Sequence, residues 1–267
     1  MAISIDEQGT VRLGEVFVTS FSAFRRHAVV FVILSAIGHI PSFLSKLEVD
    51  HYPGFFSLYF WGFEGLSVLA FACMIIGYGA IVHGVIQDLA GRRASITEAV
   101  TVAVRRLVPL AGISIVAAVL INVVTQLPDL PDFQDRLDGV YMLFIAVWMQ
   151  WLVTGLYFLV APIFIAEQPD VGAALSRCRF LTKGQRRPVF SAIFLVSILN
   201  LAIFCLWRAG TAPLVPIGSG WGVLVIHDAV TGAVWVVLGA FNAVLAAVFY
   251  DRLRSIKGGM DIVKVFD

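Results

Sequence analysis

Residues Ala229–Tyr250 read AVTGAVWVVLGAFNAVLAAVFY, and residues 251–254, which follow directly, read DRLR. An uncharged run of this length, at about 1.5 Å of rise per residue, is long enough for a helix to cross the roughly 30 Å hydrocarbon core of a bilayer. Charged residues that follow such a run stay in water or among lipid headgroups. The run therefore predicts a transmembrane helix with a polar end.

Five further runs have the same character, and the composition of the whole chain agrees with them. Hydrophobic residues make up 59% of the 267 residues and charged residues only 14%, against about 25% in ordinary soluble domains. The mean hydropathy is +0.90. We therefore expect an all-α membrane protein of six transmembrane helices, folded as a single domain over residues 1–267. The five further spans are Ala28–Ser45, Leu66–Ile86, Leu107–Val124, Val140–Ala166 and Val189–Trp207.

The basic residues divide unequally between the two ends of these spans. Lys and Arg are enriched in cytoplasmic loops, and only Lys46, Arg136 and Arg208 fall on one side. We expect a multi-pass protein of the bacterial inner membrane, with both termini and a short tail (252–267) in the cytoplasm. The other side carries Arg12, Arg25, Arg26, Arg92, Arg93, Arg105, Arg106, Arg177, Arg179, Lys183, Arg186, Arg187, Arg252, Arg254, Lys257 and Lys264.

Pairs of adjacent arginines precede the first, third and fifth spans, and the two intervals between successive pairs are nearly equal. Each pair follows a short amphipathic stretch. The positive-inside tendency alone also produces basic loops, but the matched spacing and the matched apolar faces favour a repeat. We expect three repeats, each an interfacial amphipathic helix followed by a transmembrane hairpin. The pairs are Arg25 and Arg26, Arg105 and Arg106, and Arg186 and Arg187; the repeats cover about 12–88, 95–168 and 170–251.

One face of each amphipathic stretch is apolar, with helical spacing. This face would lie against acyl chains or against the bundle, while the six paired arginines meet anionic headgroups. Ser95 and Glu98 have the spacing of a capping box, Asp170 is placed to cap the third stretch, and Gly184 to end it. The faces are Leu13, Val16, Phe17, Phe21 and Phe24; Ile96, Ala99, Val100, Ala103 and Leu107; and Val171, Ala174, Leu175, Cys178 and Leu181.

Three segments resemble a broad bacterial family that includes YciC-like proteins and the membrane domain attached to some glycerophosphodiester phosphodiesterases. They are residues 174–187 (ALSRCRFLTKGQRR), residues 247–254 (AVFYDRLR) with 258–261 (GGMD), and residues 87–95 (QDLAGRRAS). The similarity extends over nearly the whole chain. It implies an integral membrane protein with six spans, and it supplies no catalytic residues.

Polar side chains inside the predicted spans are the first functional candidates, because burying them in hydrocarbon is costly. His39 lies near the middle of the first span, Gln150 and Asn200 near the middles of the fourth and fifth, and Asn242 in the sixth. Such groups either hydrogen-bond between helices, for about 0.6–2 kcal/mol each, or line a polar path. The sequence leaves both roles open.

Two acidic residues, Glu64 and Asp228, fall at the outer ends of spans, where they are either hydrated or form the outer mouth of a path. A proton-coupled transporter usually carries an acidic residue near the middle of a span, and none is found there. This absence weakens a transport function.

Signatures of enzymes, cofactors and metals are missing from the sequence. It contains no HExxH, GxSxG or Walker motif, and its histidines and cysteines are not at metal-ligand spacing. The net charge of +1 gives no reason to expect a nucleic-acid partner. We therefore expect no enzyme activity and no cofactor.

The function predicted from the sequence is that of an accessory, scaffold or assembly protein of the inner membrane. It would act through contacts with lipid, at the cytoplasmic headgroups, or with a larger membrane protein complex. The alternative is a small transporter or channel with a path through the three-repeat bundle, and a membrane-embedded lipid enzyme comes third. The two leading functions differ in whether the polar side chains converge on one cavity or pair separately between helices.

Overall fold

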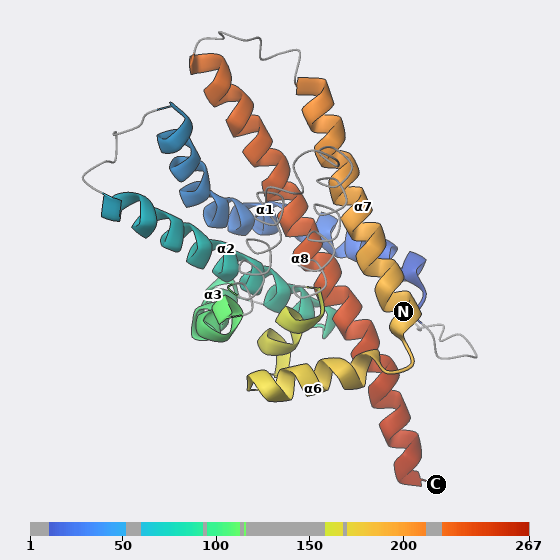
Figure 1. Cartoon of the computed structure of the whole chain (residues 1–267). Helices are drawn as coiled ribbons and strands as arrows, with labels where there is room; N and C mark the ends of the chain where they lie inside the picture. Colours follow the sequence, from blue (N-terminus) through green and yellow to red (C-terminus); the bar gives the residue numbers. More distant parts are fainter. Residues whose placement is uncertain are drawn as a thin grey trace, which may run out of the picture.

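A computed structural model describes residues 11–51, 60–92, 95–112, 115, 158–167, 170–211 and 221–266. Every regular element within these ranges is a helix (Figure 1). The all-α class is therefore confirmed. The helices are α1 (Leu13–His51), α2 (Phe60–Leu89), α3 (Ile96–Arg105), an unlabelled segment (Phe158–Glu167), α6 (Val171–Thr182), α7 (Arg186–Thr211) and α8 (Trp221–Phe266).

Four of these helices contain stretches long and apolar enough to cross a membrane. A fifth candidate exists if Phe158–Glu167 and Gly172–Thr182, which meet at a bend of 117°, form one broken span. A multi-pass membrane protein is thus supported. Most of the predicted spans Leu107–Val124 and Val140–Ala166 lies outside the described residues, so the number six stays a prediction. The four stretches are Leu13–Ile40, Leu69–Leu89, Arg186–Trp207 and Val225–Lys257.

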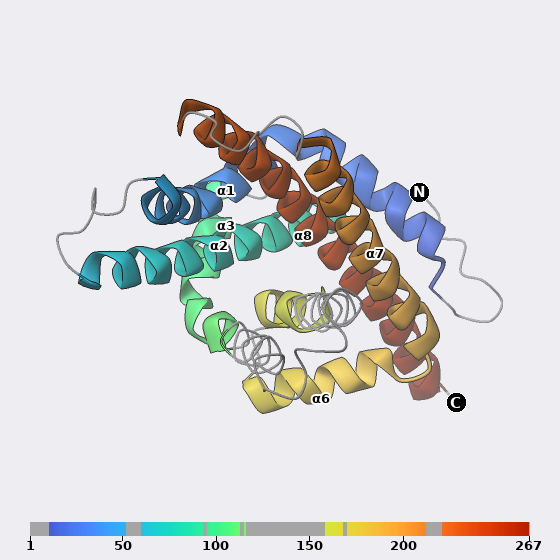
Figure 2. The ribbon, with the colours of Figure 1, turned by 45° about the horizontal axis from the view of Figure 1, so that its top comes forward.

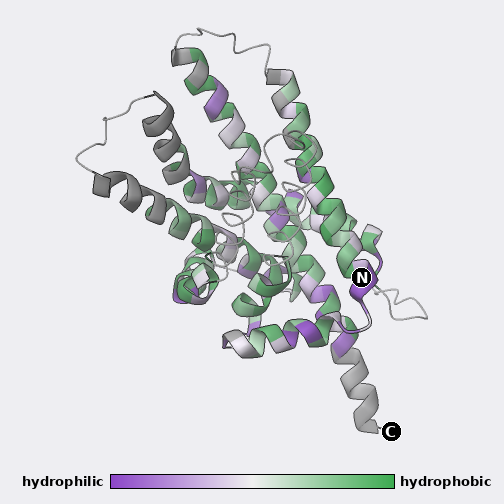
Figure 3. Ribbon diagram, in the orientation of Figure 1, coloured by the Kyte–Doolittle hydropathy of each residue, from purple (hydrophilic) through white to green (hydrophobic). Residues whose placement is uncertain are grey.

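The outward faces of the long helices are apolar. On α1, Val29, Ile33, Ile37 and Ile40 follow one another along the helix, and each is more than half exposed. Figure 3 shows apolar residues along α7 and α8, with hydrophilic residues gathered around α6 and the adjoining part of α8. Water would penalise such a surface, whereas acyl chains accept it.

The helical backbone is interrupted close to each arginine pair. Helix α1 bends at His27, whose φ of −122° and ψ of 19° are not helical. Helix α3 ends at Arg105, and Arg106 separates it from residues 107–112, which are again helical. Helix α6 ends at Thr182, and Gly184, at φ +82°, makes the turn into α7. The end of the third amphipathic stretch is therefore as predicted, because glycine adopts this left-handed conformation without strain.

The amphipathic stretches pack against the bundle. Val16, Ala99, Ala103, Ala174 and Leu181 are buried, as predicted for their apolar faces. Three residues predicted on the same faces are instead at least half exposed: Phe21, Ile96 and Leu175. Both outcomes lie within the prediction, which allowed each apolar face to lie against the bundle or against acyl chains, because helical periodicity does not distinguish an apolar residue that faces protein from one that faces lipid.

The predicted capping bonds do not form. Ser95 and Asp170 occupy the residue before α3 and α6, as expected, but neither side chain makes a capping hydrogen bond. Glu98 lies instead near His83 of α2, with 3.8 Å between Oε1 and Nε2. The capping box is therefore replaced by a contact between helices.

The middle of α8 lies in the core of the bundle. All eight residues from Ala243 to Tyr250 are buried. Figures 1 and 2 show α7 and α2 on different sides of α8, with α1 crossing behind α8 and α6 lying across the same bundle. The ring of Phe158 packs on Phe249 with 5.0 Å between centroids. A helix segment that is apolar and buried all round is a core element rather than a lipid-facing one.

Helices α1 and α2 approach so closely that their contact requires glycine. A Cβ atom added at Gly77 would stand 2.8 Å from the carbonyl oxygen of Leu34, and one added at Gly38 would stand 3.0 Å from that of Cys73. Real Cβ atoms essentially never come within 3.0 Å of another heavy atom. Small residues at such crossings allow membrane helices to pack backbone to backbone.

We expect Gly77→Ala to force α1 and α2 apart and to lower the free energy of unfolding by about 1–3 kcal/mol. Gly112→Ala is the matched control, because a Cβ atom there meets nothing within 4 Å. Both variants can be measured by denaturation with sodium dodecyl sulfate in mixed micelles. Equal stability of the two variants would contradict the close crossing.

Candidate functional site

Two of the polar residues predicted within spans are brought together. The Nδ2 group of Asn242, in α8, donates to Oδ1 of Asn200, in α7, at 3.3 Å. Asn200 is buried. Each amide thus satisfies part of the hydrogen-bonding capacity of the other, and the pair joins two long apolar helices.

His39 is held within its own helix. Its Nδ1 group donates to the carbonyl oxygen of Ser35 at 2.8 Å, and the hydroxyl of Ser35 donates to the carbonyl oxygen of Val236 in α8, also at 2.8 Å. The ring lies at the close approach of α1 to Gly239. His39 is therefore part of the seam between α1 and α8, and its hydrogen bond is separate from that of the pair Asn200–Asn242.

The remaining predicted polar residues do not complete a path among the described residues. Asp228 is only 8% exposed, and its Oδ1 atom lies 3.4 Å from Nδ1 of the adjacent His227. Gln150 and the side chain of Glu64 lie outside the described part of the chain. Within that part, the predicted polar groups pair separately instead of converging on one cavity.

A stronger polar cluster joins three segments at the end of the bundle that carries the arginine pairs. The carboxylate of Glu167 accepts from Nε of Arg177 in α6, at 3.1 Å and 2.9 Å to its two oxygens. The hydroxyl of Tyr250 in α8 donates to Oε1 of Glu167 at 2.7 Å. Hydrogen bonds to a charged group are about twice as strong as neutral ones. Glu167 therefore fixes α6 to the central helix.

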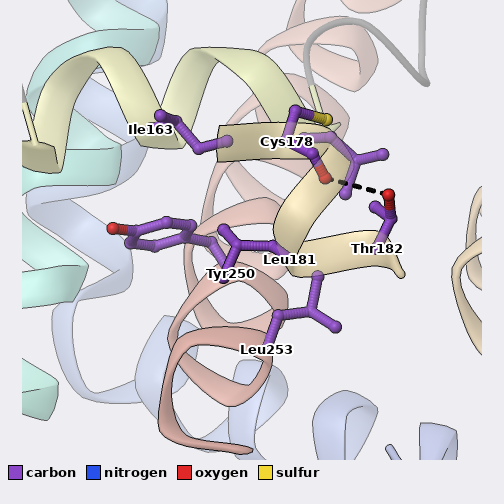
Figure 4. A pocket seen from close by; sticks show the side chains of 7 residues that line it. Ile163, Cys178, Leu181, Thr182, Tyr250 and Leu253 are labelled. Carbon is purple, nitrogen blue, oxygen red and sulfur yellow. Dashed lines mark hydrogen bonds between the residues drawn. The ribbon is translucent and has the colours of Figure 1, made fainter. Parts of the chain in front are cut away.

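The space beside this cluster is apolar and tight. Figure 4 shows Ile163, Leu181 and Leu253 around the ring of Tyr250, and the hydroxyl of Thr182 donates to the carbonyl oxygen of Cys178 at 2.9 Å. Leu159 completes the lining, and the space between these side chains is too narrow for a water molecule. It is a packing seam without room for a substrate.

A second cluster lies at the bend of α1. Nε2 of His27 lies 3.2 Å from Oδ1 of Asp88, at the end of α2, and the guanidinium of Arg26 lies 3.5 Å from Oδ2. Asp88 thus ties the bend of α1 to the end of its neighbour. Arg26, whose side chain is 56% exposed, thus has an internal ion-pair partner and also reaches the surface.

Three contacts between short and long helices follow one pattern. Thr19, Glu98 and Arg177, on the three amphipathic stretches, are evenly spaced along the chain. Their partners are spaced almost as evenly: each lies near the end of the apolar stretch of the helix that precedes the short helix or, for Thr19, of the last helix, α8. The partners are Arg252 (3.4 Å from Thr19), His83 (3.8 Å from Glu98) and Glu167 (2.9 Å from Arg177).

The beginning of the described chain also meets its last third. The backbone N–H of Val11 donates to Oε1 of Gln185, in the turn between α6 and α7, at 3.3 Å. Gln185 is buried. Together with the contact of Thr19 with Arg252, this bond holds the beginning of the described chain against its last third.

The six arginines predicted to contact lipid differ in exposure. Arg25, Arg105, Arg186 and Arg187 are exposed. Arg26 is exposed but ion-paired with Asp88, and Arg106 is half-buried and already has an interaction partner. Among the described residues, the other four arginines have no ion-pair partner, which makes them the candidates for contact with anions outside the protein.

Comparison of the chain with protein-family models, with curated proteins and with solved structures finds no match. The resemblance to the YciC-like family thus stays a prediction, and no site residue is carried over from a relative.

Glu167 and Tyr250 escaped the search of the sequence for polar residues. Both lie at the ends of apolar runs, where charged and hydroxyl groups are ordinary. One signal was present: an acidic residue stands near the end of the second, fourth and sixth predicted spans, at Asp88, Glu167 and Asp251. The intervals between these three positions are close to those between the arginine pairs, so the positions form a set that matches the repeat.

We expect Glu167→Gln to lower the free energy of unfolding by about 1–3 kcal/mol, because it leaves Arg177 without its counterion and weakens the bond from Tyr250. Asp170→Asn is the matched control: it makes the same chemical change at an exposed residue whose side chain does not cap α6, and should stay within about 0.5 kcal/mol. A double-mutant cycle with Arg177→Gln measures the coupling. Purely additive effects would contradict the ion pair.

Proposed function

We propose that this chain is a non-enzymatic integral membrane protein that acts through contacts with lipid or with a larger membrane protein complex. The observation that carries the proposal is the separate pairing of its intramembrane polar groups. His39 bonds within the seam of α1 and α8, and Asn242 bonds to Asn200 between α7 and α8. Polar groups paired in this way hold helices together and leave no set of free ligands for a solute.

The packing of α8 supports the same proposal. A transporter or channel formed by three repeats would need space near the axis of the bundle, and eight consecutive buried residues of α8 fill the core that is described. The narrow apolar seam beside Tyr250 offers no binding site for a polar solute. Among the described residues, contact surfaces on the outside of the bundle are therefore the better candidates for function.

The architecture we propose has six spans in three repeats. It is supported by the breaks near the three arginine pairs and by the evenly spaced contacts of Thr19, Glu98 and Arg177. Each repeat would dock its amphipathic helix on the last helix of the repeat before it, with the first repeat docking on the third. Such a ring corresponds to parallel repeats around an axis along the membrane normal.

We further propose that the end of the bundle with the arginine pairs faces the cytoplasm, in a bacterial inner membrane. The support is the strong excess of Lys and Arg on that side of the predicted spans. The resemblance to the YciC-like family agrees with this location and with a role other than catalysis.

The proposal is tested by purifying tagged protein in a gentle detergent and identifying co-purifying proteins and lipids by mass spectrometry. We expect a stoichiometric membrane protein partner or a retained class of lipid. Asn242→Ala should lower the free energy of unfolding by about 0.6–2 kcal/mol, because Asn200 loses its partner. It should leave solute flux into proteoliposomes at the level of protein-free vesicles.

A different result would favour transport. If the protein purifies alone with a bound small solute, and if flux of that solute in proteoliposomes falls on Asn242→Ala, the path through the bundle becomes the better account. Thr101→Ala is a control for the flux measurement, because its hydroxyl is exposed and bonds to the carbonyl oxygen of Thr97 in the same helix.

A further inference from the structure

Four basic residues gather where α6 turns into α7. We call Arg179, Lys183, Arg186 and Arg187 the α6–α7 corner, and all four are exposed. From Val171 to Thr211 the chain contains no Asp or Glu. Among the described residues, no carboxylate lies within ion-pair distance of any of the four.

An aromatic side chain lies within the corner and is flanked by further cations. Phe180 is partly exposed, with the guanidinium of Arg177 5.3 Å and the ammonium of Lys257 5.8 Å from the centre of its ring. Arg177 is neutralised by Glu167, but Lys257 adds its charge to the corner. An exposed aromatic ring among cations is typical of a surface at the membrane interface.

An exposed apolar column continues from the corner along α7. Phe190, Phe194 and Ile198 follow Arg186 at intervals of four residues, and their exposed fractions are 52%, 54% and 43%. Residues four apart lie on neighbouring positions of one helix face. The α6–α7 corner therefore adjoins, at the start of α7, an exposed apolar surface of the kind that acyl chains contact.

We propose that the α6–α7 corner binds the headgroup of an anionic phospholipid whose acyl chains lie along Phe190, Phe194 and Ile198. Cations that have no counterion among the described residues match the phosphate, and the apolar column matches the tails. A soluble anion would contact only the cations of the corner, whereas a phospholipid contacts both the cations and the apolar column. The inference rests on the proposed function and names the lipid class and the place of contact.

The structure also explains why this corner differs from the other two arginine pairs. Arg26 is engaged by Asp88, and Arg106 is half-buried with a partner of its own. Each of those pairs thus offers one available arginine, at Arg25 and Arg105. The corner offers four cations close together along the chain, with Arg179 in the last turn of α6, Lys183 in the link, and Arg186 and Arg187 in the first turn of α7.

The inference is tested by native mass spectrometry of the purified full-length protein titrated with phosphatidylglycerol and, separately, with phosphatidylcholine. We expect the double variant Arg186→Gln, Arg187→Gln to weaken phosphatidylglycerol binding about thirtyfold, and to leave phosphatidylcholine binding unchanged. The matched control Arg25→Gln, Arg105→Gln removes the same total charge, but from two arginines that belong to different pairs. This control variant should retain most of the affinity for phosphatidylglycerol.

A second variant tests whether the acyl chains of the lipid contribute to binding. Phe190→Ser combined with Phe194→Ser should weaken phosphatidylglycerol binding, and soluble glycerol phosphate should compete poorly with the lipid for the unaltered protein. Competition by glycerol phosphate at the affinity of the lipid would show a site for soluble anions and overturn the assignment to lipid.

Unchanged phosphatidylglycerol binding in the Arg186, Arg187 variant would overturn the corner as the site. If the unaltered protein still prefers phosphatidylglycerol to phosphatidylcholine in that case, the proposed function through lipid contacts survives, and only its location is wrong. Absence of that preference in the unaltered protein would remove both the corner and lipid recognition, and would leave a protein complex as the remaining form of the proposed function.

Discussion

The burial of α8 on every side between Ala243 and Tyr250 is the constraint on which the other features depend. A lipid-facing helix needs only one packed stripe, but this segment must be covered all round. Helices α1, α2, α6 and α7 all contact α8, and Gly239 allows α1 to approach it closely at His39. Once this helix occupies the core, little space is left there for a solute.

The polar interactions follow from the same arrangement. In the hydrocarbon region they are few and pair locally, as Asn242 does with Asn200, because an unpaired group there is costly. At the end with the arginines they are charged and join helices, as Glu167 joins α6 to α8. Among the described residues, Arg186 and Arg187 have no carboxylate partner, which is why the proposed lipid contact is placed at them.

Hydropathy predicted the helical class and the four spans that the structure describes, because a bilayer requires long uncharged helices. Periodicity placed the short helices, but it did not decide which residues of their apolar faces are buried: Val16 and Ala174 are buried, whereas Phe21 and Leu175 are exposed. The contacts of Glu167 could not be predicted, because Tyr250 is far away along the chain and nothing local specifies their meeting.

Cysteine accessibility along α8 in intact membranes tests the central claim, a core filled by this helix, most directly. Single cysteines would replace Ala243, Val244, Ala246 and Ala247 in turn, in a protein whose Cys73, Cys178 and Cys205 are changed to Ala, and would be exposed to a charged thiol reagent. The account predicts no modification at any of these four positions until the protein is unfolded. Rapid modification at two or more of these neighbouring positions would reveal a water-filled path beside α8 and would contradict the claim that this helix fills the core.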